Sequence, residues 1–202
     1  MHINFHFATG VIFASILNNF FNFTLFEFIL IVFFSFICDF DVFLNKYAKD
    51  HNHRLLVTHS IIPSLIIIIL GYTLNLPLII FSGYSYCIHI IIDTLDWGTN
   101  LFYFQKKQVG FKLLISKKEF ENLPSYLLKY RNPSSFFDEK YYNNKICLGI
   151  EVITFILMVI FSVIFALEYV FILPLYFLLL YFHLQRHFKL KKIEKSHRES
   201  KF

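Results

Sequence analysis

Most of the residues that could do chemistry in this chain lie in residues 36–96, within a sequence otherwise rich in Phe, Ile and Leu. His89, Asp93 and Asp96 are spaced i, i+4 and i+7, so on a helix they would form one stripe. A charged side chain at the centre of a membrane helix costs about 2.5–3.5 kcal/mol, so we expect the stripe to face inward, compensated by a bound cation. The alternative is that the stripe marks a helix end in water, with His89 as a core residue. The other candidate residues are His6, Asp39, Asp41, His53, Arg54 and His59.

Two further groups of residues supply donors that bind divalent metals. Asp39 and Asp41 follow an apolar run, and a non-helical exit from that run would turn both carboxylates toward one cation. His53 and His59 supply imidazoles, and Arg54 supplies a guanidinium. Imidazole nitrogens with carboxylate oxygens suit zinc, manganese or iron better than calcium or magnesium. The sequence therefore predicts a divalent metal site, with zinc as the first choice and manganese or iron as alternatives.

The elements that must position these groups are membrane helices. The chain has 202 residues and is 56% hydrophobic, whereas soluble domains are about 45–50% apolar. A membrane-spanning helix needs about 20 mostly apolar residues, and several runs approach that length. We therefore predict an all-α, polytopic membrane helix bundle with about six spans, some of them short. The predicted runs are residues 6–20, 25–38, 55–70, 76–93, 146–167 and 170–188.

The distribution of Lys and Arg predicts the topology. All 19 basic residues lie in residues 42–54, in 103–145 or after Gln185, and the positive-inside rule assigns these segments to the cytoplasm. Both termini of this multi-pass cell-membrane protein would then be cytoplasmic, with the candidate residues near the cytoplasmic surface. The predicted organisation is membrane helices carrying the metal site in 1–102, a cytoplasmic or interfacial insert with short amphipathic helices in 103–145, two membrane helices in 146–188 and a basic tail in 189–202.

The cysteines are interpreted as structural. Cys38, Cys87 and Cys147 are odd in number and widely spaced, and no Cys-x-x-Cys pair occurs. A disulfide framework or a thiolate zinc site is therefore not expected. Free cysteines in helices commonly behave as small apolar residues, which is the role predicted for all three.

Polar residues in the second half of the chain have competing interpretations. His183 and His187 are spaced i, i+4 but have no carboxylate nearby in the sequence, so we favour snorkelling at the membrane boundary over metal binding. Glu151 lies in a predicted span and is either functional or a residue that caps the helix or pairs with Lys145. The basic tail is interpreted as a topological anchor that could contact anionic membrane lipids. Because topology accounts for the net charge of +5, nucleic-acid binding is not expected.

Taken in order, the motifs resemble the YdjM-like family of membrane-bound metal-dependent hydrolases, small inner-membrane proteins of which some are regulated by the repressor LexA. The resemblance covers about the first half of the chain. It implies a distant relation to zinc-dependent phospholipase C and the single-strand nucleases that share its fold, with clustered metal ions and phosphoester hydrolysis. Val42 stands where the family often has His, and Asp96 where it often has Thr. The motifs that carry the resemblance are His6 followed by Gly10, Asp39-x-Asp41, His53-Arg54 followed by Thr58-His59-Ser60, and His89-x-x-x-Asp93 followed by Gly98.

The resemblance also implies a mechanism. Metal ions would lower the pKa of a bound water toward about 7 for attack on a phosphorus or carbonyl centre. Arg54 would hold an anionic group bidentately, while His53 or Asp96 would act as general base or orient a metal ligand. A site at headgroup depth points to a small-molecule or lipid-linked phosphoester as substrate. The implied metal ligands are His6, Asp39, Asp41, His59, His89 and Asp93.

Two other classes of function stay open. Intramembrane His and Asp residues also mark the ion paths of transporters and metal carriers. A carrier needs a polar route across the membrane, whereas these residues are expected at one face. A non-catalytic scaffold would use the metal only to hold its helices together.

Overall fold

The fold is mainly helical in the part of the chain that the computed structural model describes, residues 2–48, 52–104 and 108–199. Within these ranges there is no named strand, and Thr99 and Val109 form an isolated antiparallel bridge. The prediction of an all-α fold is therefore confirmed for the described residues.

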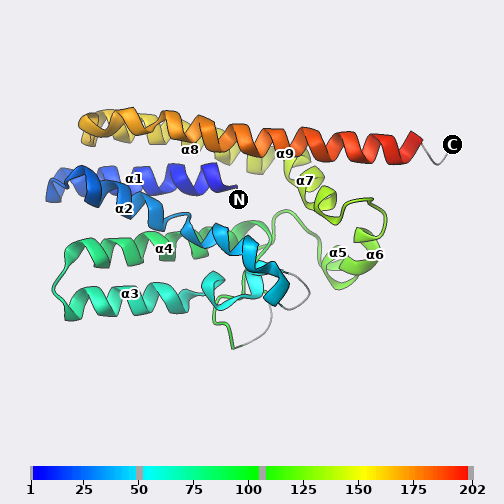
Figure 1. Ribbon diagram of the computed structural model, residues 1–202, viewed down its shortest axis with the longest axis horizontal. Helices are drawn as coiled ribbons and strands as arrows, with labels where there is room; N and C mark the ends of the chain where they lie inside the picture. The colour runs from blue at the N-terminus through cyan, green and yellow to red at the C-terminus, as the bar shows by residue number, and fades with distance from the viewer. Residues whose placement is uncertain (1, 49–51, 105–107, 200–202) are drawn as a thin grey trace.

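Six of the helices pair into three antiparallel hairpins, as Figure 1 shows. The short connections within the hairpins lie at one end of the bundle. The start of the first helix, the segment between the second and third helices, and the short helices near residue 120 lie toward the other end. The hairpins are α1 (Ile3–Phe21) with α2 (Leu25–Phe34), α3 (Ile61–Thr73) with α4 (Pro77–Asp96), and α8 (Lys145–Phe165) with α9 (Pro174–Glu199).

Local sequence signals set the ends of these helices. Asn22 has φ 49° and follows α1 in the left-handed conformation. Thr24 and Glu27 form a capping box at the start of α2, because each side chain accepts the backbone N–H of the other residue. The hydroxyl of Ser60 caps α3. Pro77 occupies the first turn of α4, where its missing N–H removes no helical hydrogen bond. The predicted helix start at Pro77 is confirmed.

Helices α1 and α2 approach each other closely at Gly10. A Cβ atom on Gly10 would lie 2.6 Å from the Cβ atom of Ser35, so glycine is what permits this approach. The Ser35 hydroxyl donates a hydrogen bond of 2.8 Å to the backbone carbonyl of His6. Helix α1 also packs against α8 and α9, and the shared core includes Met158 and Tyr176. These contacts fix the depth and rotation of the turn that carries His6.

Three segments are long and apolar enough to cross a membrane, namely Pro77–Asp96, Lys145–Phe165 and Leu167–Glu199. This finding indicates a membrane protein. Helices α2 and α3 are apolar but contain only 10 and 13 residues. At 1.5 Å per residue they are about 15 and 20 Å long, shorter than the roughly 30 Å of a bilayer core.

The chain between α2 and α3 differs from the prediction of a helix through Cys38, a loop over residues 42–54 and a helical run from Leu55. Pro63 explains why α3 begins no earlier than Ile61. A proline fits the first turn of a helix but would break one that began several residues before it. The observed elements here are the 3₁₀ helices η1 (Ile37–Tyr47), η3 (His53–Leu55) and η4 (Val57–His59).

The segment predicted as an insert forms short helices that dock on the last long helix. The Glu194 carboxylate in α9 accepts the backbone N–H groups of Arg131 and Asn132, just before α7. Helix α9 extends beyond its partner α8, and this extension carries the contact (Figure 1). The short elements in this half are α5 (Lys117–Glu121), α6 (Leu123–Leu127), α7 (Pro133–Asn143) and η5 (Leu167–Ile172).

Candidate metal centre

The nine candidate residues named from the sequence come together at the end of the bundle where α1 begins and α4 ends. Each of them makes a polar contact with at least one other member. Side chains that could share a metal ion form three overlapping groups, which we call the central cluster. The groups are Cys38, His59 and His89; His6, Asp39, His89 and Asp93; and Asp41, His53 and His59.

Asp93 lies at the middle of the central cluster. Its Oδ1 atom is 3.2 Å from Nε2 of His6, and its Oδ2 atom is 3.2 Å from Nε2 of His59 and 3.5 Å from Nε2 of His89. All four side chains are completely buried. The rings of His6 and His89 are stacked, with their centroids 3.7 Å apart. Imidazoles from α1, η4 and α4 therefore converge on one carboxylate.

Hydrogen bonds on the far side of two rings fix which nitrogen faces Asp93. Nδ1 of His89 lies 2.7 Å from the carbonyl oxygen of Ser35, and Nδ1 of His59 lies 2.7 Å from Oδ2 of Asp41. Because both oxygens only accept hydrogen bonds, each Nδ1 carries a hydrogen, and each ring in its neutral form presents an Nε2 lone pair. Both Nε2 atoms are buried without a hydrogen bond in the described structure.

These lone pairs face carboxylate oxygens, an arrangement that requires positive charge between them. Nε2 of His89 is 3.6 Å from Oδ1 of Asp39 as well as 3.5 Å from Asp93. Burial disfavours the protonated form of His59, but the adjacent carboxylates of Asp41 and Asp93 outweigh burial and raise its pKa to about 9. The site attracts a cation, which a proton or a metal ion could supply. A proton would bridge only one nitrogen and one oxygen, whereas one metal ion would satisfy several lone pairs at once. The donor set fits a metal ion.

Asp39 and Asp41 approach the cluster from different sides. Oδ1 of Asp39 lies 3.6 Å from Nε2 of His89 and 4.0 Å from Nε2 of His59. Asp41 contacts Nδ1 of His59, lies 3.5 Å from Nδ1 of His53 and accepts a hydrogen bond of 2.5 Å from the hydroxyl of Thr58. The expected non-helical exit is instead the 3₁₀ helix η1. With three residues per turn, residues two apart point about 120° away from each other, which separates the two carboxylates.

Arg54 and Asp96 form a bidentate ion pair at the edge of the central cluster. Nη1 and Nη2 of Arg54 lie 2.8 and 3.1 Å from the two oxygens of Asp96, and Nη2 lies 3.3 Å from Oδ1 of Asp93. The backbone N–H of Trp97 also donates to Asp96. Arg54 is therefore occupied by protein carboxylates, so the predicted role as holder of a substrate anion does not fit this geometry. Nor does a role of Asp96 as general base, because the guanidinium stabilises its anion.

His53 and Asp39 mark the side of the cluster that reaches solvent. Their side chains are 22% and 19% exposed, in contrast to the fully buried His6, His59 and His89. Burial and the neighbouring His59 lower the pKa of His53 to about 4, so its imidazole is neutral at neutral pH. A neutral imidazole on this partly exposed side can accept a proton or ligate a metal.

Sequence reasoning missed the participation of Cys38 and misjudged the second pair of histidines. Cys38 is buried within reach of His59 and His89. Its position directly before Asp39 was the available signal. His187 was expected to have no carboxylate nearby, yet its Nδ1 lies 2.6 Å from Oδ2 of Asp138 in α7. That contact is tertiary and leaves no local pattern.

Glu151 has partners other than Lys145. Its carboxylate accepts hydrogen bonds from the side-chain amide of Asn4 and from the hydroxyl of Tyr141. The contact joins α1, α7 and α8 close to the turn that carries His6. Glu151 is therefore a buried structural partner, and the alternative pairing with Lys145 does not describe this site.

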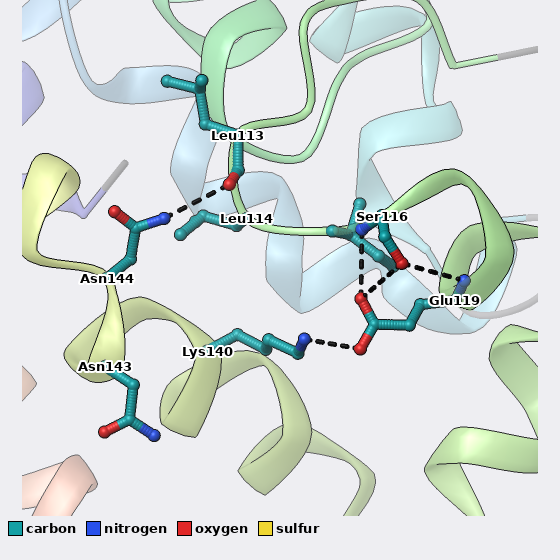
Figure 2. A pocket seen from close by; sticks show the side chains of 8 residues that line it. Leu113, Leu114, Ser116, Glu119, Lys140, Asn143 and Asn144 are labelled. Atoms are coloured by element: carbon teal, nitrogen blue, oxygen red, sulfur yellow. Dashed lines mark hydrogen bonds and ion pairs between the residues drawn. The ribbon is translucent and has the colours of Figure 1, made fainter.

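A shallow depression of about 470 Å³ lies away from the central cluster, beside α5 and α7. Figure 2 shows its polar groups engaged with one another: Lys140 contacts the carboxylate of Glu119, and the amide of Asn144 donates 3.2 Å to the carbonyl of Leu113. The charged side chains of Lys140 and Glu119 therefore already have partners within the protein. The central cluster is the better candidate for chemistry.

Comparison with family models, with curated proteins and with solved structures found no match for this chain. The resemblance drawn from the motifs therefore stays a hypothesis, and the function is argued below from the geometry.

Proposed function

We propose that this chain is a membrane-embedded, metal-dependent hydrolase that acts at the cytoplasmic headgroup level on a phosphoester, lipid-linked or small. The observation that carries the proposal is the convergence of buried Nε2 lone pairs from His59 and His89 on the carboxylate of Asp93. Zinc is the metal we favour, because the donors are imidazoles and carboxylates. The motif resemblance to the YdjM-like hydrolases supports the same reaction class.

In the proposed topology, the three helical hairpins all enter the membrane from the side that carries the central cluster. The hairpin connections lie at one end of the bundle and contain no Lys or Arg, which supports this arrangement (Figure 1). The short helices α2 and α3 would reach only part of the bilayer depth. Irregular backbone such as η3 and η4 is tolerated at membrane depth where it is buried in protein.

Each residue of the central cluster has a role in this proposal. A bound divalent metal supplies a Lewis acid and activates water at neutral pH. His6, His59, His89 and Asp93 would hold the metal. Asp41 and the Ser35 carbonyl orient the rings of His59 and His89 through their Nδ1 hydrogens. Arg54, paired with Asp96, positions Asp93.

The opening of the cluster is where substrate would enter. Asp39 and His53 are its partly exposed members, and His53 is neutral at neutral pH. On the basis of its exposure, we assign His53 as the proton acceptor for an attacking water. Aromatic residues are exposed nearby, with Phe40 44% and Phe43 77% accessible, and such side chains suit the headgroup region.

A metal-stapled scaffold is the second candidate. It is favoured by the complete burial of His6, His59, His89 and Asp93, since structural metal sites have closed ligand shells. The hydrolase and the scaffold would both bind the metal, but only the hydrolase would turn over a substrate.

The test is to purify the protein in detergent, remove bound metal with a chelator, reload the protein with zinc and measure both metal content and hydrolysis. Phospholipids in mixed micelles and soluble phosphodiesters serve as substrates. We expect zinc-dependent turnover in wild type and its loss in His53→Ala with bound zinc retained. His187→Ala, a histidine that contacts a carboxylate outside the cluster, is the matched control.

Other outcomes would overturn the proposal. Stoichiometric zinc with no turnover on any ester would establish the scaffold instead. Gradient-driven metal flux in proteoliposomes, without hydrolysis, would establish a carrier.

A further inference from the structure

The three cysteines lie in different surroundings. Cys147 belongs to an apolar cluster with Phe5 and Leu114, and Cys87 is partly buried on α4. Cys38 is 3% exposed in η1 and precedes Asp39. Among the described residues, Cys38 is the cysteine that belongs to a group able to hold a metal ion. The chain therefore contains its own internal controls for a thiol at the central cluster.

The sulfur of Cys38 lies where the free nitrogens of two buried histidines converge. Its Sγ atom and one ring nitrogen from each of His59 and His89 all lie within 4.8 Å of one another. Both Nδ1 atoms are engaged by Asp41 and Ser35, which leaves the two Nε2 atoms, buried and without hydrogen bonds in the described structure. In a tetrahedral zinc site, with Zn–S of about 2.3 Å and Zn–N of about 2.0–2.1 Å, the ligand atoms are roughly 3.3–3.7 Å apart. Small side-chain movements would bring these three atoms to that spacing.

We propose that Cys38 is a ligand of the metal centre, adding a sulfur donor beside His59 and His89 to the nitrogen and oxygen donors proposed above, and that it makes the site selective for thiophilic cations such as zinc. This inference rests on the proposed function, because it adds a donor to the same centre. It reverses the sequence interpretation of Cys38 as a small apolar residue.

The chemistry of the set is balanced for a divalent ion. The Cys38 thiol would lose one proton to solvent on binding, and the thiolate and the Asp93 carboxylate together carry two negative charges. The imidazoles of His59 and His89 bind as neutral ligands. A dication would therefore neutralise the buried donors. Thiolate favours zinc over manganese or magnesium, which prefer oxygen donors.

Cobalt(II) reports a sulfur ligand directly, since it replaces zinc and gives a thiolate charge-transfer band in the near ultraviolet in addition to its visible ligand-field bands. We expect both kinds of band in wild type and in the Cys87→Ser/Cys147→Ser double variant. Cys38→Ser should keep the ligand-field bands and lose the charge-transfer band. It should also weaken zinc binding by more than about tenfold, which is the lower limit seen when a residue that only hydrogen-bonds to a metal ligand is lost. Manganese binding should stay nearly unchanged.

The outcomes separate this inference from the proposed function. Ligand-field bands without charge transfer in wild type would overturn the sulfur ligand but leave the metal centre intact. No cobalt bound at all would overturn both. A charge-transfer band that survives in Cys38→Ser, or disappears in Cys87→Ser/Cys147→Ser, would assign the sulfur elsewhere and overturn the inference. If Cys38→Ser does not fold, the spectra of wild type and the double variant still decide.

Discussion

Two regions of this molecule contain a histidine against an aspartate, and they differ in what surrounds the pair. In the central cluster, Nδ1 of His59 lies 2.7 Å from Asp41, and its Nε2 faces a second carboxylate inside the protein. Between α7 and α9, Nδ1 of His187 lies 2.6 Å from Asp138, and the His187 side chain is 17% exposed. A short His–Asp contact is common to both. The lesson is that convergence of further buried donors, and not the contact itself, distinguishes a candidate metal centre from a structural pair.

The largest expected effect comes from removing the middle of the central cluster. The double substitution His89→Ala/Asp93→Ala deletes two donors and should lower zinc affinity by more than about 100-fold, beyond the 10–100-fold typical of outer partners. Elemental analysis after dialysis against a chelator measures the loss. The matched double variant His187→Ala/Asp138→Ala should keep its metal. Equal metal content in the two double variants would remove the distinction between the regions.

The ion pair of Arg54 with Asp96 should matter for stability more than any ion pair on the α5–α7 side. Arg54→Gln removes the guanidinium that pairs with the buried Asp96 carboxylate. Loss of one partner of a buried ion pair typically lowers the free energy of unfolding by about 3–5 kcal/mol. Thermal unfolding in detergent, in the presence of zinc, is the measurement. Lys117→Gln breaks a pair with Glu121 whose side chains are 91% and 57% exposed, so no measurable shift is expected. Similar midpoints for both variants would contradict the structural role of Arg54.

Neutralising the aspartate of each His–Asp contact tests whether the orientation of the histidine ring contributes to zinc affinity. Asp41→Asn should weaken zinc binding about 10–100-fold without abolishing it, because Asp41 fixes the ring of His59 from outside. Asp138→Asn should leave zinc affinity unchanged. Isothermal titration of stripped protein measures both affinities. Complete loss of binding in Asp41→Asn would instead make Asp41 a direct ligand, as the sequence motif implied.

The smallest effect is expected from pH at the depression beside α5 and α7 (Figure 2). The hydrogen bond from Lys140 lowers the pKa of Glu119 from 4.5 to about 2. The contact between Glu119 in α5 and Lys140 in α7 therefore stabilises the docking of α5 on α7 fully above pH 4.5, and this stabilisation is lost as the pH falls toward 2. Trp97, the single tryptophan, lies 4.9 Å from the ring of Phe137 in α7 and reports docking by fluorescence.

The matched variant for this test is Lys140→Met, which removes the cation that depresses the pKa of Glu119. In that variant the fluorescence change should move to higher pH. An acid transition at the same pH in both proteins would show that the Lys140–Glu119 contact does not contribute to docking.

The parts of the site that depend on local periodicity could be predicted from the sequence. Pro77 marks the start of α4, and the i, i+4 spacing of His89 and Asp93 needs only helical geometry. The grouping of Asp41 with His53 and His59 was implied by the motif resemblance, but local periodicity does not predict their contacts, since these depend on three 3₁₀ helices whose chain direction no periodic pattern specifies.

Other features depend on contacts between distant segments. Asp138 and His187 are 49 residues apart, and only the packing of α7 on α9 brings them together. Arg54 was assigned to binding a substrate anion. Its actual partner, the carboxylate of Asp96 on α4, lies 42 residues away in the sequence, so the pairing could not be seen locally. Cys38 looked apolar because a cysteine in an apolar run carries no local sign of its neighbours. Composition and spacing thus indicated which residues belong to the site, whereas only the three-dimensional structure shows which of them contact one another.

The most direct test of the central claim is X-ray absorption spectroscopy of zinc-loaded protein, combined with anomalous diffraction at the zinc edge. The account predicts one zinc position or a close group of positions among His6, His59, His89 and Asp93, with imidazole scattering at about 2.0–2.1 Å. Zinc located only near His183 and His187, or no ordered zinc at the central cluster, would contradict it.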